Sequence, residues 1–220
     1  EGRSLVTDVL RALRQIRIVP MIVIDDPLNA VPLAGALSDG GIPCVEITFR
    51  TSTAAEALRR IAAECPEVLI GAGTVLTPEQ AAWAKAAGAQ FVVSPGLNLR
   101  VVDYCLTHDM PVFPGVCTPT EVEAALGKGL HALKFFPAEP IGGLAYLKAI
   151  AAPYSDVEFI PTGGITTANL ASYLTFKKVI ACGGSWLAPA ERIAARQFDS
   201  IRDEARAASE IARGALVPSV

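Results

Sequence analysis

The stretch FVVSPGLNLRVVDYCLTHDMPVFPGVCTPTEVEAALGKGLHALKFFPA, residues 91–138, alternates short apolar runs with longer amphipathic segments. Its apolar runs have the length and composition of buried strands, and they are Phe91–Ser94, Val112–Pro114 and Ala132–Phe136. The segments between them, Leu99–Thr107 and Pro119–Leu126, have the residue spacing of amphipathic helices. This alternation predicts parallel strands that are joined by crossover helices.

The same alternation continues on both sides of this stretch. Five more strand-like runs are Ile18–Ile24, Pro43–Phe49, Val68–Gly71, Phe159–Pro161 and Val179–Ala181. Five more helical segments are Leu28–Ser38, Thr53–Glu64, Pro78–Ala87, Leu144–Ala151 and Thr167–Leu174. Eight such strands with intervening helices predict a single-domain (β/α)8 TIM barrel over residues 1–220, with extra helices at 4–15 and 197–213. The alternative is an open doubly wound sheet, but no GxGxxG motif follows the first strand.

Composition and charge exclude several classes of function. The chain is 51% hydrophobic and has a net charge of -3, so it has no general basic field for nucleic acid. It has no uncharged apolar stretch long enough to span a membrane. Five cysteines without a CxxC pair predict free thiols in a reducing compartment, the cytoplasm. With only two histidines, we expect no metal site.

Lys134 lies inside the last apolar run of the quoted stretch. Loss of water disfavours the ammonium form of a buried lysine. A neutral amine in a pocket is a nucleophile that can form a Schiff base with a carbonyl substrate. The alternative is a structural lysine that reaches solvent at the strand end or pairs with a carboxylate.

Polar residues at the ends of other strands give Lys134 potential partners. In a (β/α)8 barrel, function lies at the carboxyl ends of the strands. Side-chain alternation in the second run predicts Glu46, Thr48 and Arg50 on one face, as an acid/base beside an anion-binding guanidinium or as a structural ion pair. Thr74 follows the third strand among glycines that let a ligand approach the backbone, or that only form a turn.

Two glycine pairs follow the last two strands of the predicted barrel. Thr162 precedes Gly163 and Gly164, and Gly183 and Gly184 precede Ser185. Exposed backbone N–H groups at this position bind phosphate in many such barrels. The alternative is that both pairs are ordinary tight turns.

Seven stretches, which span nearly the whole chain in order, resemble those of the family of 2-keto-3-deoxy-6-phosphogluconate (KDPG) and 4-hydroxy-2-oxoglutarate (KHG) aldolases. They are VEITFRT (45–51), GAGTVL (71–76), SPG (94–96), PVFPGVCTPTE (111–121), LKFFPAE (133–139), PTGGI (161–165) and GGSWL (183–187). The resemblance implies a metal-independent and cofactor-independent class I aldolase of the Entner–Doudoroff pathway. It also implies a homotrimer that acts on a small phosphorylated keto acid.

The resemblance further implies roles for individual residues. Lys134 would form the Schiff base and Glu46 would transfer protons. The pyruvate pocket would be lined by Arg50, Thr74, Pro95, Phe136 and Thr162. The phosphate would be bound by Gly163, Gly164, Gly183, Gly184 and Ser185.

Three alternatives stay open at this stage. One is a phosphogalactonate aldolase or another Schiff-base lyase on the same fold, although the phosphogalactonate enzymes look different in the last two stretches. Another is a non-catalytic phosphosugar-binding barrel, which would not require Glu46 and Lys134 together. The third is a metal-dependent pyruvate aldolase, which the scarcity of histidine argues against.

Overall fold

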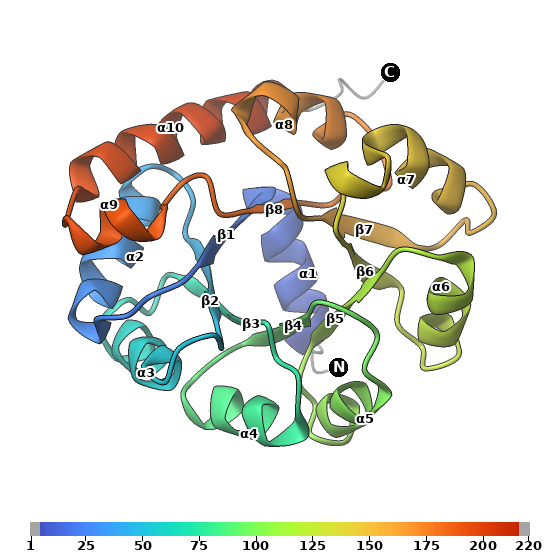
Figure 1. Cartoon of the computed structure of the whole chain (residues 1–220), viewed down its shortest axis with the longest axis horizontal. Helices are drawn as coiled ribbons and strands as arrows, with labels where there is room; N and C mark the ends of the chain where they lie inside the picture. Colours follow the sequence, from blue (N-terminus) through green and yellow to red (C-terminus); the bar gives the residue numbers. More distant parts are fainter. Residues whose placement is uncertain (1–4, 216–220) are drawn as a thin grey trace.

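The computed structural model describes residues 5–215 and shows eight parallel strands in the order β7-β6-β5-β4-β3-β2-β1-β8 (Figure 1). The strands are β1 (Ile18–Ile22), β2 (Cys44–Thr48), β3 (Leu69–Gly73), β4 (Phe91–Ser94), β5 (Val112–Val116), β6 (Ala132–Phe135), β7 (Glu158–Pro161) and β8 (Cys182–Gly184). Single parallel bridges, Phe159 to Val179 and Thr162 to Gly183, connect the two ends of this order. The predicted (β/α)8 barrel is therefore confirmed, and the open doubly wound alternative is wrong.

Helices form an outer layer around the strands (Figure 1). The α-helices are α1 (Leu5–Ile16), α2 (Ala30–Asp39), α3 (Ala54–Glu64), α4 (Pro78–Ala86), α5 (Leu99–Thr107), α6 (Pro119–Leu126), α7 (Gly143–Ala151), α8 (Thr167–Leu174), α9 (Ala190–Ala194) and α10 (Phe198–Gly214). Two short 3-10 helices are η1 (Pro27–Asn29) and η2 (Glu139–Ile141). The strands are buried almost throughout because the helices cover one face and side chains fill the barrel interior.

Threonine–proline pairs begin two of these helices. Thr77 accepts a hydrogen bond from the Gln80 amide, and Thr118 forms a capping box with Glu121. The side chains satisfy amides that have no partner inside the helix, while proline fits the first turn because it lacks an amide hydrogen.

Helix α1 lies behind the strands in Figure 1, at their amino ends. It lines a hollow together with Pro111 and Ala132, which precede or begin strands, and its Leu13 is fully buried. Arg14 of this helix forms an ion pair with Glu158 of β7 at 2.5 Å. The extra amino-terminal helix is thus confirmed for residues 5–16, and the carboxyl ends of the strands form the opposite rim.

One expectation about the last part of the barrel was wrong, and one helix there was not predicted. The eighth strand is Cys182–Gly184, not 179–181, because residues 182–184 pair with Ile18–Pro20 of β1. Glycine is a poor strand former, so this register depends on a partner strand that is distant in sequence. Helix α9 was not predicted, because its five residues are too few for a periodic pattern.

All five cysteines lie in the described part of the chain and are free thiols. Four of them are buried in the core, and Cys117 is partly buried. Within residues 5–215, no helix combines the length and the apolar character required to cross a membrane.

Candidate active site

Lys134 and Glu46 are brought together inside the barrel. Lys134 is one residue from the end of β6, and Glu46 is at the middle of β2. Both residues are only 3% exposed, and Lys134 Nζ lies 3.9 Å from Glu46 Oε1. At this distance the two charges interact, but they do not share a hydrogen bond. Lys134 does not reach solvent at the strand end, so of the structural alternatives only pairing with a carboxylate agrees with its position.

The carboxyl group of Glu46 is strongly desolvated. Burial raises its pKa, while the positive charges of Lys134 and Arg50 partly offset this increase. Oε1 is buried and accepts no hydrogen bond from any described residue. A carboxyl group with a raised pKa and a free acceptor atom is suited to general acid–base chemistry.

Glycines on the neighbouring strands make space for this pair and its surroundings. A Cβ atom on Gly73 would lie 2.0 Å from Glu46 Oε1, and a Cβ atom on Gly71 would lie 2.2 Å from the Phe91 ring. These glycines therefore accommodate protein side chains, whereas the sequence analysis expected them to admit a ligand or to form a turn. Gly115, beside Lys134 in the sheet register, similarly leaves room for the backbone of Pro95.

Arg50 lies beyond the end of β2, which contradicts the expectation that it alternates on the strand with Glu46 and Thr48. The strand ends at Thr48, which is buried and donates a hydrogen bond to the Ile22 carbonyl oxygen. Arg50 is in the following turn and is exposed. Its charge still lowers the pKa of Glu46, so it lies within electrostatic reach of the carboxylate.

Other residues of the predicted pyruvate pocket follow their strands in order around the rim. Thr74 comes directly after β3 and has a positive φ of 55°, a backbone conformation that is uncommon outside glycine and often occurs at functional sites. Pro95 follows β4 and is partly buried. Phe136 follows β6, and its ring centre lies 5.2 Å from Lys134 Nζ. An aromatic face at this distance attracts a cation.

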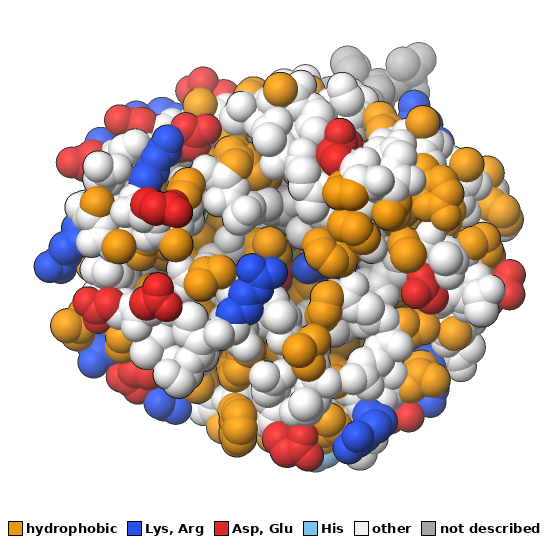
Figure 2. Space-filling view, in the orientation of Figure 1, with side chains coloured by type: hydrophobic (Ala, Val, Ile, Leu, Met, Phe, Trp, Pro, Cys, Tyr) orange, Lys and Arg blue, Asp and Glu red, His pale blue; other side chains and the backbone are white. Residues whose placement is uncertain are grey.

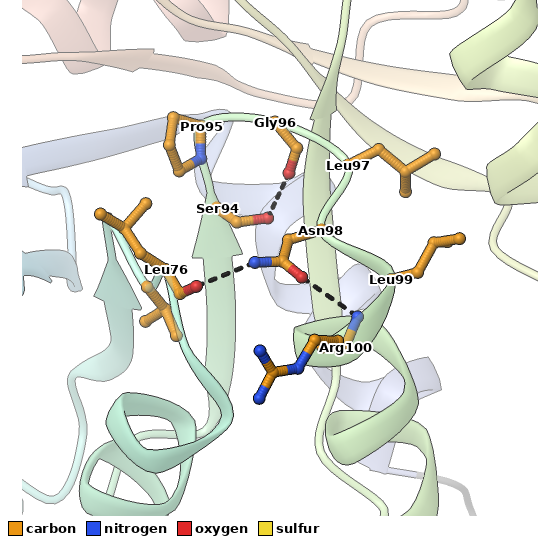
Figure 3. Close-up of a pocket in the computed structure, with 9 residues that line it drawn as sticks. Leu76, Ser94, Pro95, Gly96, Leu97, Asn98, Leu99 and Arg100 are labelled. Carbon is orange, nitrogen blue, oxygen red and sulfur yellow. Dashed lines mark hydrogen bonds between the residues drawn. The ribbon is translucent and has the colours of Figure 1, made fainter.

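A groove of about 600 Å³ lies beside Pro95 on the outer part of the rim (Figure 3). Asn98 organises its wall by donating to the Leu76 carbonyl oxygen at 2.8 Å and accepting from the Arg100 amide at 3.1 Å. Leu76 and Leu99 are exposed in it. Neither Lys134 nor Glu46 lines this groove, although it is larger than the other described hollows. This groove is therefore separate from the buried lysine–glutamate pair, which is the candidate chemical site.

The two predicted glycine pairs lie next to each other at the ends of β7 and β8. Thr162 is buried, and a Cβ atom on Gly183 would lie 2.4 Å from its hydroxyl oxygen. Gly163 and Gly164 have φ values of 101° and 81°, so this turn requires residues without a side chain. Gly184 lies in β8 against the Trp186 ring, rather than in a turn, and Ser185 is exposed after it.

Side chains around the rim differ in character from one side to the other. In Figure 2, hydrophobic side chains gather over α7 and toward the centre of the visible face. Acidic and basic side chains are concentrated over α2, α3, α9 and α10. Among residues 5–215, no group of three His, Cys, Asp or Glu side chains is arranged to hold a metal ion.

Sequence reasoning missed Glu139 and Tyr173, whose side chains support the turn at Gly163 and Gly164. The Tyr173 hydroxyl donates to Glu139 Oε1 at 2.5 Å, and the Glu139 amide donates to the Gly163 carbonyl oxygen at 3.0 Å. A tyrosine at a core position of a helix gives no local signal of such a contact. The glutamate of LKFFPAE was the only available indication.

Comparison with known proteins agrees with this geometry. The family model described as KDPG and KHG aldolase matches residues 9–203. The chain belongs to the KDPG and KHG aldolase family. It is therefore an aldolase, a carbon–carbon lyase. A 2-dehydro-3-deoxy-phosphogluconate aldolase from Treponema pallidum is 54% identical over 193 residues, which cover 88% of this chain and 92% of the relative.

Two solved structures of such aldolases are similar over most of the chain. One is a KDPG aldolase from Legionella pneumophila with pyruvate captured as a covalent carbinolamine intermediate (TM-score 0.87, 39% identity, covering 91% of this chain and 97% of that one). The other is a KDPG aldolase from Zymomonas mobilis with 3-phosphoglycerate (TM-score 0.88, 38% identity, covering 96% and 100%).

The raised pKa of Glu46 predicts a pH-dependent effect of Glu46→Gln on stability. A carboxyl whose pKa is higher in the folded than in the unfolded state stabilises the fold at low pH, and this contribution is lost as pH rises through the folded pKa. Glutamine does not titrate. We therefore expect the free energy of unfolding of Glu46→Gln, relative to wild type, to increase from pH 4 to pH 8 in urea titrations.

Glu56→Gln is the matched control, because Arg59 and Arg60 lower the pKa of the partly exposed Glu56. The free energy of unfolding of Glu56→Gln, relative to wild type, should stay constant or decrease from pH 4 to pH 8. A pH-independent difference between Glu46→Gln and wild type would contradict the desolvation of Glu46.

Proposed function

We propose that this protein is a class I aldolase that cleaves 2-keto-3-deoxy-6-phosphogluconate into pyruvate and D-glyceraldehyde 3-phosphate. The observation that carries the proposal is the Lys134–Glu46 pair, which is buried inside the barrel. A nucleophilic amine and a proton-transfer group within 4 Å are what a Schiff-base aldolase requires. A barrel that only binds phosphosugars has no need for both, so the pair disfavours a non-catalytic function.

The reaction begins when the ammonium group of Lys134 gives up a proton and the resulting amine attacks the C2 ketone of the substrate. Loss of water from the carbinolamine gives a protonated imine, which withdraws electrons from the C3–C4 bond. Glu46 accepts the proton of the C4 hydroxyl, the C3–C4 bond breaks, and the aldehyde leaves. The remaining enamine is protonated at C3, and hydrolysis of the imine releases pyruvate and restores Lys134.

The residues around Lys134 hold the pyruvate part of the substrate. Arg50 binds the carboxylate, since a guanidinium donates two parallel hydrogen bonds to such a group. Thr74 contributes its hydroxyl, and Pro95, Phe136 and Thr162 form the remaining wall. The position of Arg50 after the strand, at the exposed end of the site, supports this role because a charged carboxylate arrives from solvent.

The phosphate binds at the opposite side of the rim from Thr74, between the ends of β7 and β8. Backbone amides of Gly163, Gly164, Gly183 and Gly184 surround it, and the Ser185 hydroxyl donates to it. The start of α8, three residues after Gly164, adds the partial positive charge of a helix amino terminus.

We also propose that the enzyme cleaves 4-hydroxy-2-oxoglutarate to pyruvate and glyoxylate. The matching family model covers both activities by its description. The smaller substrate needs the Lys134 site but not the phosphate site. The substrate of the phosphogalactonate aldolases differs from 2-keto-3-deoxy-6-phosphogluconate only in its configuration at C4. A coupled lactate dehydrogenase assay with both C4 epimers therefore distinguishes phosphogluconate from phosphogalactonate specificity.

We propose a homotrimer that works in the cytoplasm. The family resemblance supports the trimer, and the five free thiols suit a reducing compartment. Sedimentation equilibrium should give three times the chain mass of 23.0 kDa. A monomer mass at micromolar concentration would contradict the trimer. Recovery of the protein from an oxidising compartment would contradict the cytoplasmic location.

The Schiff base predicts a covalent adduct on Lys134. Borohydride reduction in the presence of pyruvate should attach a stable three-carbon group to the enzyme, and peptide mapping should locate it at Lys134. EDTA should not prevent the adduct, because the iminium supplies the electrophile. Lys148→Ala, which removes a different lysine, is the control and should still be trapped at residue 134. Absence of an adduct in wild type would rule out the mechanism.

Removal of the proton-transfer group should slow turnover without removing the nucleophile. In Glu46→Gln we expect kcat to fall about 10²–10⁴-fold, the usual contribution of general acid–base catalysis. Steady-state kinetics measures this effect, and borohydride trapping on Lys134 should persist. Unchanged turnover would show that another group moves the proton.

The phosphate site predicts selectivity for substrate. Ser185→Ala should raise KM for 2-keto-3-deoxy-6-phosphogluconate by about tenfold, the contribution of one hydrogen bond to a charged group. KM for 4-hydroxy-2-oxoglutarate, which has no phosphate, should stay unchanged. Equal effects on both substrates would place the phosphate elsewhere.

A further inference from the structure

Tyr173 and Glu139 form a side-chain bond behind the phosphate site, and it connects two rim segments. Tyr173 belongs to α8, is 1% exposed, and donates its hydroxyl to Glu139 Oε1 at 2.5 Å. Glu139 begins η2, five residues after Lys134 in the chain. The bond therefore joins the segment that follows the lysine strand to the helix that follows the phosphate turn.

Glu139 also holds the turn directly. Its amide donates to the Gly163 carbonyl oxygen at 3.0 Å, and the preceding Ala138 amide donates to the Thr162 carbonyl oxygen at 2.8 Å. The Glu139 side chain packs against Gly164, where a Cβ atom would lie 2.6 Å from Glu139 Cβ. The backbone of Glu139 thus contacts Gly163, and its side chain contacts Gly164.

Neighbouring residues are arranged so that the Tyr173–Glu139 bond can form. Gly143 has a φ of 62°, and a Cβ atom on it would lie 2.9 Å from Glu139 Oε1 and 3.4 Å from the Tyr173 hydroxyl. On the other side of the turn, Asn169 Nδ2 donates to the Gly164 carbonyl oxygen at 3.0 Å. Glu139 and Asn169 therefore hold the glycine turn from two sides.

Resting on the proposed phosphate site, we propose that Glu139, fixed by Tyr173, is a positioning residue that sets the specificity of this enzyme for phosphorylated substrates. Fixed side chains hold the backbone of the glycine turn in the geometry that binds phosphate. The turn then loses little conformational entropy when the substrate binds, so the affinity is higher. Burial and the neighbouring carboxylate also raise the pKa of Tyr173.

The test is Tyr173→Phe, which removes the hydroxyl but keeps the ring in the core. KM for 2-keto-3-deoxy-6-phosphogluconate should rise severalfold, with an upper bound of about tenfold set by the contribution of one hydrogen bond to a charged acceptor. Turnover of this substrate at saturation and both constants for 4-hydroxy-2-oxoglutarate should change less than about twofold. Glu139→Gln keeps an acceptor for the Tyr173 hydroxyl. It should therefore raise KM for 2-keto-3-deoxy-6-phosphogluconate less than Glu139→Ala does.

Tyr154→Phe is the matched control, because Tyr154 donates to a different glutamate, Glu123, in the outer helical layer. Tyr154→Phe should leave KM and kcat unchanged for both substrates. An equal effect of Tyr173→Phe on both substrates, or none on either, would overturn the inference. If Ser185→Ala is selective while Tyr173→Phe is not, only the inference fails. If Ser185→Ala affects both substrates equally, the proposed phosphate site fails and the inference fails with it.

Discussion

The burial of Lys134 beside Glu46 is the constraint on which the rest of the site depends. Removing two ionisable groups from water is expensive, and their mutual attraction at 3.9 Å offsets only part of that cost. The raised pKa of Glu46 shows that desolvation outweighs the two nearby positive charges. A pair of this kind weakens the fold more than an apolar pair of the same volume would, so its retention is better explained by chemistry than by stability.

The barrel supplies what this pair needs. Neighbouring strands provide glycine where a larger residue would displace the carboxylate, as at Gly73. Helix α1 packs at the amino ends of the strands, and the turns that follow the strands form the opposite rim. In the proposed function, Arg50 binds the substrate carboxylate at one side of this rim, and the glycine turns of β7 and β8 bind the phosphate at the other. Because the strands are parallel, all of these groups meet at one end although they are far apart in sequence.

Much of this arrangement could be predicted from the sequence, since alternating apolar runs and amphipathic segments identify the strands and helices. The pattern also indicated Lys134 and Glu46, because charged residues are unusual inside apolar runs. It failed where long-range contacts decide the structure. Pairing with β1 sets the position of β8 at Cys182–Gly184. The end of β2 at Thr48, which places Arg50 outside the strand, is also set by pairing with the neighbouring strands. The Tyr173–Glu139 bond likewise has no local signature.

Exchange of the methyl hydrogens of pyruvate for deuterium in D2O, followed by proton NMR, tests the central claim most directly. Exchange requires an imine to Lys134 and a group that removes and returns a proton, and it requires neither the phosphate site nor carbon–carbon cleavage. We expect fast exchange with the wild-type enzyme, strongly reduced exchange with Glu46→Gln and none with Lys134→Met. Exchange at the wild-type rate in Lys134→Met would contradict the account.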